Sequence, residues 1–512
     1  MNDKLKGIIV CGVVVACLGA TLGVLKLTGV DTSDEDEEDS SEESTSSEEE
    51  DESVQLIDVE TDDIAQIYVT NEYGSFTYVG ESESGKDAAG IAELEGLTLS
   101  TAAVSDIGED TAQLTAYKLA EEDATDLSKY GLENPASTFE ITFRDDTQRT
   151  FMIGDNANQN RYRYVYEEGT TDVYMVLETT MTAFLERKED LLDTTLLASS
   201  SDDEDEIDFG VLTVSRADLD YDMVFEQDDG SYEKSNENMP SAQVMTSPIF
   251  SYLNGTTSSD IIFSLYGLTA IEAEVIFPDE EDLAEYGLDD PIVTVTFVGD
   301  DYDYTLLIGN EYHELNDEGE EQSEASAYYC TFSGVDGHDC IWKIDASSLP
   351  WIDLEPTDVV TTLMTWNMVV DVTEINITGD ETVDIDITSE VVEDEDDSDD
   401  DDEEEDKEVT AVEIDGEEVD VELFKSLYEY ILSCPTTEVW FEDPDEEDSY
   451  LTLDIVTEDG GGDTLEFYKD TERRTIVKLN GATSYRIQSK WVDRLLSNVE
   501  AVKNGEDVED DY

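Results

Sequence analysis

The chain has 512 residues, enough for about two to four domains at roughly 100 to 200 residues each. Its 134 acidic residues against 25 basic ones give a formal net charge of −109, which repels phosphate backbones and argues against nucleic acid as a partner. Hydrophobic residues still make up 39% of the chain, with 25 Tyr and 15 Phe, so most of it can build packed cores.

An uncharged apolar stretch runs over Gly7–Leu25 and is flanked by Lys4, Lys6 and Lys26. A helix of this length spans about 29 Å, close to the roughly 30 Å hydrocarbon core of a bilayer. Residues 1–29 are therefore predicted to hold one transmembrane helix that anchors the chain in the cell membrane. The lysines before the stretch predict a cytoplasmic N-terminus and an extracytoplasmic remainder.

Two other interpretations of the apolar stretch stay open. Val14–Cys17 has the form of a lipoprotein processing site, in which Cys17 is lipidated. A cleaved signal peptide is the other, although the stretch is longer than the usual 7 to 15 residues of such a region. All three interpretations place the rest of the chain outside the cytoplasm.

Four acidic segments divide the rest of the chain. Residues 30–53 have almost no apolar side chains, which predicts a disordered stalk extended by charge repulsion. Residues 199–206 (SSSDDEDE) predict a linker, residues 393–408 a disordered loop within a domain, and residues 501–512 an acidic tail. These segments can attract divalent cations weakly, but they lack the spacing of a dedicated calcium loop.

The most informative pattern is an internal repeat. The segment LSKYGLENP (127–135) recurs 156 residues later as LAEYGLDDP (283–291). An alternating apolar strand follows each copy, and a second strand then ends in Ile-Gly, at Gly154 and Gly309. Residues 54–198 and 207–364 are therefore predicted to be two copies of one module.

A third, degenerate module is predicted over residues 365–500. Leu451, Leu453 and Ile455 alternate as in a strand, and Leu423–Ile431 has the spacing of an amphipathic helix. This copy lacks both Tyr-Gly-Leu and Ile-Gly. The predicted fold class is α+β, with tandem modules of antiparallel sheet packed with helices after one N-terminal transmembrane helix.

The repeated motif is best explained as a helix end. Gly131 is expected in the left-handed position after a short helix that ends at Tyr130, Leu132 packs back on that helix, and Pro135 prevents its continuation. Gly154 is expected at a sharp strand end rather than in a phosphate loop, because no nucleotide-binding glycine pattern surrounds it. The second copy assigns the same scaffold roles to Tyr286, Gly287, Leu288, Pro291 and Gly309.

Residues able to do chemistry are scarce. Cys330 and Cys340 flank a loop of hairpin size and can pair as a disulfide, whereas a metal site that joins them with His338 is the weaker alternative. The only other histidine is His313, and no Gly-x-Ser-x-Gly nucleophile motif is present. We therefore assign no catalytic residue, no cofactor and no metal site, and expect the protein not to be an enzyme.

With its N-terminal anchor, its L-x-x-Y-G-L-x-x-P element and the following Ile-Gly, the sequence resembles a bacterial family of unknown function, numbered 4340. That family is membrane-anchored and often encoded beside genes for ABC transporters and gliding-motility-like auxiliary proteins. The resemblance implies a non-enzymatic extracytoplasmic protein that is accessory to an ABC-type transport or cell-envelope complex. The alternative is an acidic cell-surface spacer or a Ca²⁺-binding protein.

Overall fold

The computed structural model describes residues 53–82, 88–158, 160–199, 209–228, 241–316, 319–391, 407–445, 448–458 and 460–511. The predicted anchor Gly7–Leu25, the stalk up to residue 52, the linker from residue 200 and the acidic loop up to residue 406 lie outside these ranges. No helix among the described residues combines the length and the apolar composition needed to cross a bilayer.

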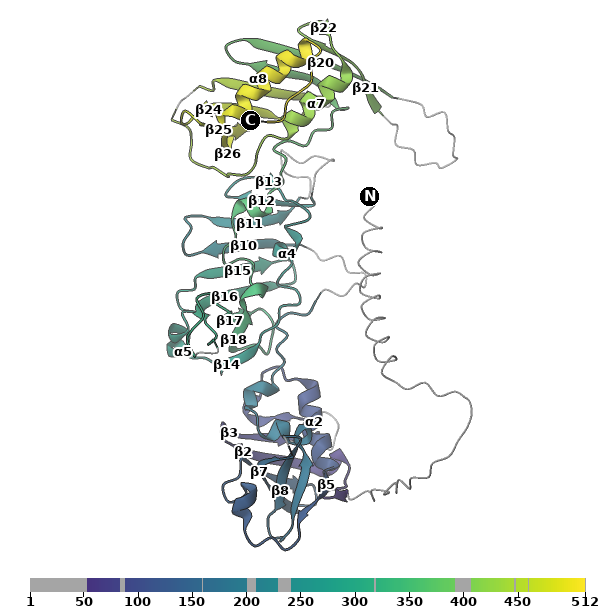
Figure 1. The fold of residues 1–512 in the computed structure, drawn as a ribbon, viewed down its shortest axis with the longest axis vertical. Helices are drawn as coiled ribbons and strands as arrows, with labels where there is room; N and C mark the ends of the chain where they lie inside the picture. The colour runs from purple at the N-terminus through teal and green to yellow at the C-terminus, as the bar shows by residue number, and fades with distance from the viewer. Residues whose placement is uncertain are drawn as a thin grey trace, which may run out of the picture. The chain divides into compact units, whose positions relative to one another are not determined.

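The described residues form three antiparallel sheets, one in each predicted module (Figure 1). The first sheet has the strand order β1-β5-β9-β8-β7-β6-β2-β3-β4. Its strands are β1 (Val54–Gln55), β2 (Ile64–Asn71), β3 (Gly74–Val79), β4 (Gly90–Ile91), β5 (Thr115–Glu121), β6 (Ser137–Phe143), β7 (Gln148–Ala157), β8 (Tyr162–Glu167) and β9 (Val173–Leu177).

The second sheet has the order β13-β12-β11-β10-β15-β16-β17-β18-β14. Its strands are β10 (Val211–Arg216), β11 (Asp222–Gln227), β12 (Gln243–Ser247), β13 (Ser251–Tyr252), β14 (Glu272–Ile276), β15 (Val293–Val298), β16 (Asp303–Tyr312), β17 (Ala327–Ser333) and β18 (Cys340–Asp345).

The third sheet has the order β22-β21-β20-β19-β23-β24-β25-β26. Its strands are β19 (Val372–Thr378), β20 (Thr382–Val391), β21 (Lys407–Ile414), β22 (Glu417–Glu418), β23 (Leu451–Thr457), β24 (Thr464–Lys469), β25 (Arg474–Leu479) and β26 (Ala482–Gln488).

The three sheets share one topology. In each, the first long strand of the module (β2, β10 or β19) pairs with the strand that opens a four-strand meander (β6–β9, β15–β18 or β23–β26). The strand beyond the meander is β5 in the first sheet and β14 in the second, and the third keeps only an isolated bridge, Val439↔Tyr485. The degenerate third module therefore has the same central topology as the other two, and among its described residues the outer strand is reduced to that bridge.

Helices are fewer than an α+β class suggests, so the structure is mostly antiparallel sheet. Only three described helices exceed two turns: α2 (Thr101–Ala112), α7 (Val421–Leu432) and α8 (Ser489–Lys503). Figure 1 shows α7 and α8 lying along one face of the third sheet, where Tyr430 stacks on Trp491 at 5.3 Å between ring centroids. The remaining helices are short: α3 (Glu178–Met181), α4 (Ser259–Ile262), α5 (Glu280–Glu285), α6 (Pro356–Val359) and the 3-10 turns η1 (Thr61–Asp63), η2 (Ala92–Leu94), η3 (Leu127–Tyr130), η4 (Thr182–Phe184), η5 (Lys188–Leu191) and η6 (Ala346–Ser348).

The period-two pattern explains which face of the first sheet is buried. Ile67 and Val69 on β2 and Phe139 and Ile141 on β6 are register partners with no exposed surface. Burying a side chain of this size contributes roughly 1.5–3 kcal/mol. Helix α2 belongs to the same core, and it begins where the Ser100 hydroxyl accepts a hydrogen bond from the backbone N–H of Ala103.

The acidic insert of the third module leaves and re-enters the sheet at neighbouring positions. Val391, the last residue of β20, is the register partner of Lys407, the first residue of β21. Residues 392–406 therefore connect two strands that are already paired up to their ends.

Candidate functional site

The Tyr-Gly-Leu motif ends a short helical turn in both copies. Gly131 follows η3 with φ +71°, and the backbone N–H of Leu132 donates to the Leu127 carbonyl at 3.2 Å. Gly287 follows α5 with the same φ, and the N–H of Leu288 donates to the Leu283 carbonyl at 2.8 Å. The helix expected to end at Tyr130 is a single 3-10 turn, which spans Leu127–Tyr130. A left-handed glycine that closes the last carbonyls of a helix is the geometry that the expected cap requires.

The Ile-Gly motif lies directly against this cap. A Cβ atom at Gly154 would overlap the carbonyl oxygen of Tyr130 and crowd the side chain of Leu132. In the second copy, a Cβ at Gly309 would meet the carbonyl of Tyr286 in the same way. Both glycines therefore allow a close backbone approach, and the two sequence motifs are two halves of one contact.

The prolines complete that contact. The residue after Pro135 donates its N–H to the Ile153 carbonyl at 2.8 Å, and the residue after Pro291 donates to the Ile308 carbonyl at 2.9 Å. Each proline thus leads the chain from the cap into the strand beside Ile-Gly. All ten motif residues, Tyr130, Gly131, Leu132, Pro135, Gly154, Tyr286, Gly287, Leu288, Pro291 and Gly309, belong to this scaffold.

The motif tyrosine also takes part in a small polar cluster that sequence reasoning missed. The ring of Tyr130 meets that of Tyr164 edge-on, with centroids 4.8 Å apart, and its hydroxyl donates to Glu121 on β5. Lys129 lies 2.5 Å from the same carboxylate. The hydrogen bond from Lys129, followed by that from Tyr130, lowers the pKa of Glu121, and the bond to Glu121 raises the pKa of Tyr130.

The second module repeats the cluster. Tyr286 meets Tyr329 at 4.6 Å between centroids, also edge-on. Burial and then the nearby carboxylate of Glu274, on the outer strand β14, raise the pKa of Tyr286. The tyrosines were visible in the sequence as a Tyr-rich strand after each motif. Their carboxylate partners were not, because Glu121 and Glu274 precede the motif by different distances.

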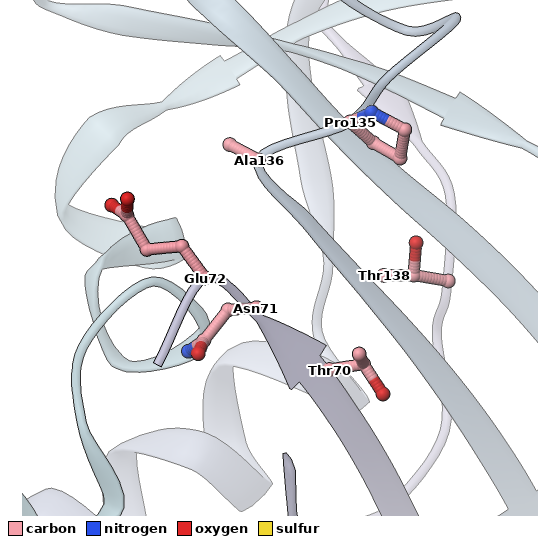
Figure 2. A pocket seen from close by; sticks show the side chains of 6 residues that line it. All are labelled: Thr70, Asn71, Glu72, Pro135, Ala136 and Thr138. Carbon is pink, nitrogen blue, oxygen red and sulfur yellow. The ribbon is translucent and has the colours of Figure 1, made fainter. Parts of the chain in front are cut away.

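A pocket of about 340 Å³ lies where β2 ends beside the start of β6. It is lined by Thr70, Asn71, Glu72, Pro135, Ala136 and Thr138 (Figure 2). Thr70 and Thr138 are register partners, so their hydroxyls share one face of the sheet. The Asn71 amide nitrogen donates to the carbonyls of Phe184 at 3.2 Å and Glu186 at 2.7 Å, which fixes the wall of the pocket.

Four of the six residues that line this pocket have polar side chains. Its side chains offer hydroxyls, an amide and one carboxylate, and its lining residues include no histidine, cysteine or lysine. The arrangement suits a small polar group held by hydrogen bonds.

The predicted disulfide is wrong, because Cys330 and Cys340 are both free, buried thiols. Cys330 pairs in register with Trp342, so Cys340, two residues before Trp342, lies diagonally across the hairpin. Diagonal neighbours are about 7–8 Å apart, beyond the usual span of a disulfide. Burial raises the pKa of the Cys330 thiol, and burial followed by Asp339 raises that of Cys340 to about 12. Both thiols therefore belong to the packed interior.

The histidines do not form a metal site. His313 contacts the Glu324 carbonyl at 3.2 Å and the Glu311 carboxylate at 3.0 Å, and His338 is only 5% exposed. Burial lowers the pKa of His338. No group of three or more His, Cys, Asp or Glu side chains within the described ranges is arranged to hold a metal ion.

Residues 90–270 match the sequence model of a domain of unknown function, DUF4340. The resemblance to this family is therefore confirmed. The match runs from β4 to just before β14, so it covers the first copy of the repeated motif and stops before the second. Comparisons with curated proteins and with solved structures find no match.

Proposed function

We propose that the protein is a non-enzymatic, extracytoplasmic binding subunit, anchored by Gly7–Leu25 and accessory to an ABC-type transport or cell-envelope complex. The observation that carries the proposal is the apolar N-terminal stretch followed by three sheet modules of one topology. Modules that repeat without a catalytic constellation are typical of proteins that present surfaces to partners.

The structural role of the two repeated motifs supports this proposal. Tyr-Gly-Leu and Ile-Gly contact each other in both copies and thereby hold the end of a helical turn on a strand. The cation-binding alternative gains no support within the described ranges, where no cluster suits a metal ion.

Membrane fractionation with gentle affinity purification tests the proposal. The full chain, carrying a C-terminal tag, should sediment with membranes, resist extraction by high salt and be digested by protease added outside the cell. A matched variant without residues 7–25 should lose membrane association and keep its folded modules. Variant Cys17→Ser distinguishes a helical anchor from a lipidated one, because only the lipidated protein depends on that thiol.

Purification from mild detergent then identifies the partner. Recovery of transporter permease or ATPase subunits at constant ratio supports the accessory function. Two results contradict it: recovery of the full chain in the soluble fraction, or purification from membranes without any other membrane protein at a constant ratio.

A further inference from the structure

The outer face of the first sheet carries an aromatic surface that the repeated motif does not use. Tyr162 and Met175 lie on the face opposite the main core and form a separate small cluster with Ala157. The ring of Tyr117, on β5, stacks on Tyr162 with centroids 4.6 Å apart and an interplanar angle of 24°. Tyr117 is 48% exposed and Leu177, the register partner of Tyr162, is 42% exposed. We call Tyr117, Lys118, Arg161, Tyr162, Met175 and Leu177 the outer aromatic patch.

Two cations border this patch. The Lys118 ammonium lies 5.8 Å from the centroid of the Tyr117 ring, and the Arg161 guanidinium lies 5.6 Å from that of Tyr162. Neither has a carboxylate partner within 4.0 Å among the described residues, although most described Lys and Arg side chains do. Lys118 and Arg161 therefore place positive charge beside exposed aromatic surface in a chain with 134 acidic residues.

The acidic residues closest to the patch along the strands are already paired. Glu121, on the same strand as Lys118, accepts from Lys129 and Tyr130. Glu178, next to Leu177, accepts from Arg163 at 2.6 Å. These pairs leave Lys118 and Arg161 as the local source of positive charge.

We propose that the outer aromatic patch binds an anionic polysaccharide, a sugar polymer that carries carboxylate groups. The exposed Tyr117 ring, supported from below by Tyr162, offers a flat apolar face on which the C–H face of a sugar ring can pack. Lys118 and Arg161 supply charge-assisted hydrogen bonds to the acid groups of the polymer. Lys118 lies on β5 and Arg161 directly precedes β8, and these two strands flank β9, so the strands are about 10 Å apart. That separation suits successive acid groups of a polymer better than one small anion.

The net charge of the chain does not prevent this interaction at physiological ionic strength. Charges beyond about 8 Å are largely screened there, so the local cations decide the sign at the patch.

The proposal is tested on the purified full chain in mild detergent with polygalacturonate as the probe, at about 150 mM salt. Neutral dextran and poly-glutamate serve as comparison polymers. The wild-type protein should bind polygalacturonate saturably. It should bind dextran, which lacks the charged contacts, and poly-glutamate, which lacks the sugar ring that packs on Tyr117, at least about tenfold more weakly. Because binding is measured without a membrane partner, its failure leaves the proposed accessory function untouched, and the reverse also holds.

Variants Tyr117→Ala, Lys118→Glu and Arg161→Glu should each weaken polygalacturonate binding about tenfold or more. Tyr117→Phe keeps the ring and should retain binding, which separates loss of the platform from loss of folding. Matched controls are Tyr73→Ala, which removes an exposed tyrosine of the same module, and Lys490→Glu, which removes an exposed lysine elsewhere.

Three results would overturn the proposal: no saturable binding of polygalacturonate, equal loss of affinity in the control variants, or equal binding of poly-glutamate. The last result would show that the patch recognises acidic polypeptides instead.

Discussion

The contact between Ile-Gly and the Tyr-Gly-Leu cap gives the sharpest prediction, through Gly154→Ala. The added methyl group overlaps the Tyr130 carbonyl, so the cap must move away from β7. Forcing one carbon into a packed site costs about 1–3 kcal/mol, and alanine recovers roughly 0.4–1 kcal/mol by restricting the unfolded chain. The midpoints of these ranges give a net loss of about 1.3 kcal/mol, which lowers the melting midpoint of a module of this size by roughly 4 °C.

Differential scanning calorimetry of the full chain measures this loss, with Gly90→Ala as the matched control. Gly90 lies in β4 of the same sheet, and its new Cβ would meet only Leu99 Cδ1 at 3.7 Å, an ordinary contact. The control should shift the midpoint by less than about 2 °C. Gly309→Ala makes the equivalent change against Tyr286 and should lower a different calorimetric transition, that of the second module.

Hydrogen exchange locates the damage. In Gly154→Ala, amides of β7 and of residues 127–136 should exchange faster, while the second module stays protected. The reasoning is refuted if Gly154→Ala and Gly90→Ala melt alike, because the close carbonyl approach would then cost nothing.

Three further predictions rest on single sites. Burial, then Asp106 and Glu109, raise the pKa of Asp110 to about 6, so ionisation of this carboxyl lowers the stability of the protein as pH rises from about 4 to 6. After allowance for solvent screening, Asp110→Asn should stabilise the protein by on the order of 1 kcal/mol at pH 7. Thermal melts should show progressively less stabilisation toward pH 4. Lys343 is 8% exposed and donates to Glu272, so Glu272→Gln should cost about 2 kcal/mol in urea unfolding, whereas the double variant with Lys343→Met should recover part of that loss. Cys330 and Cys340 should resist alkylation by iodoacetamide at pH 8 until the chain is denatured, as peptide mass spectrometry can check; native labelling of either thiol would contradict their burial.

The features that could be predicted from the sequence are those that neighbouring residues alone determine. A glycine between a helical turn and an apolar residue indicates a left-handed cap, and Gly131 and Gly287 have that conformation. Alternation predicted the strands β6 and β15, because a half-buried strand must repeat every two residues.

What could not be predicted depends on register and on long-range contact. Gly154 meets Tyr130 across 24 positions, and no local pattern encodes that approach. The disulfide failed for a related reason: a shift of two residues in the β17–β18 pairing separates a directly opposed pair from a diagonal one. Tyr117 belongs to a binding surface because its ring is exposed and stacked, properties that a sequence of 25 tyrosines does not distinguish.

The pairing of Val391 with Lys407 has a practical consequence for the third module. The sheet already holds these two ends together, so the length of the connection has little effect on stability: each doubling of length costs only about 0.6 kcal/mol of closure entropy. Evolution can therefore lengthen, shorten or recharge this segment almost independently of the fold. An experimenter can use the same position to insert a fluorescent reporter or an epitope, and so follow the protein in cells without disturbing either terminus.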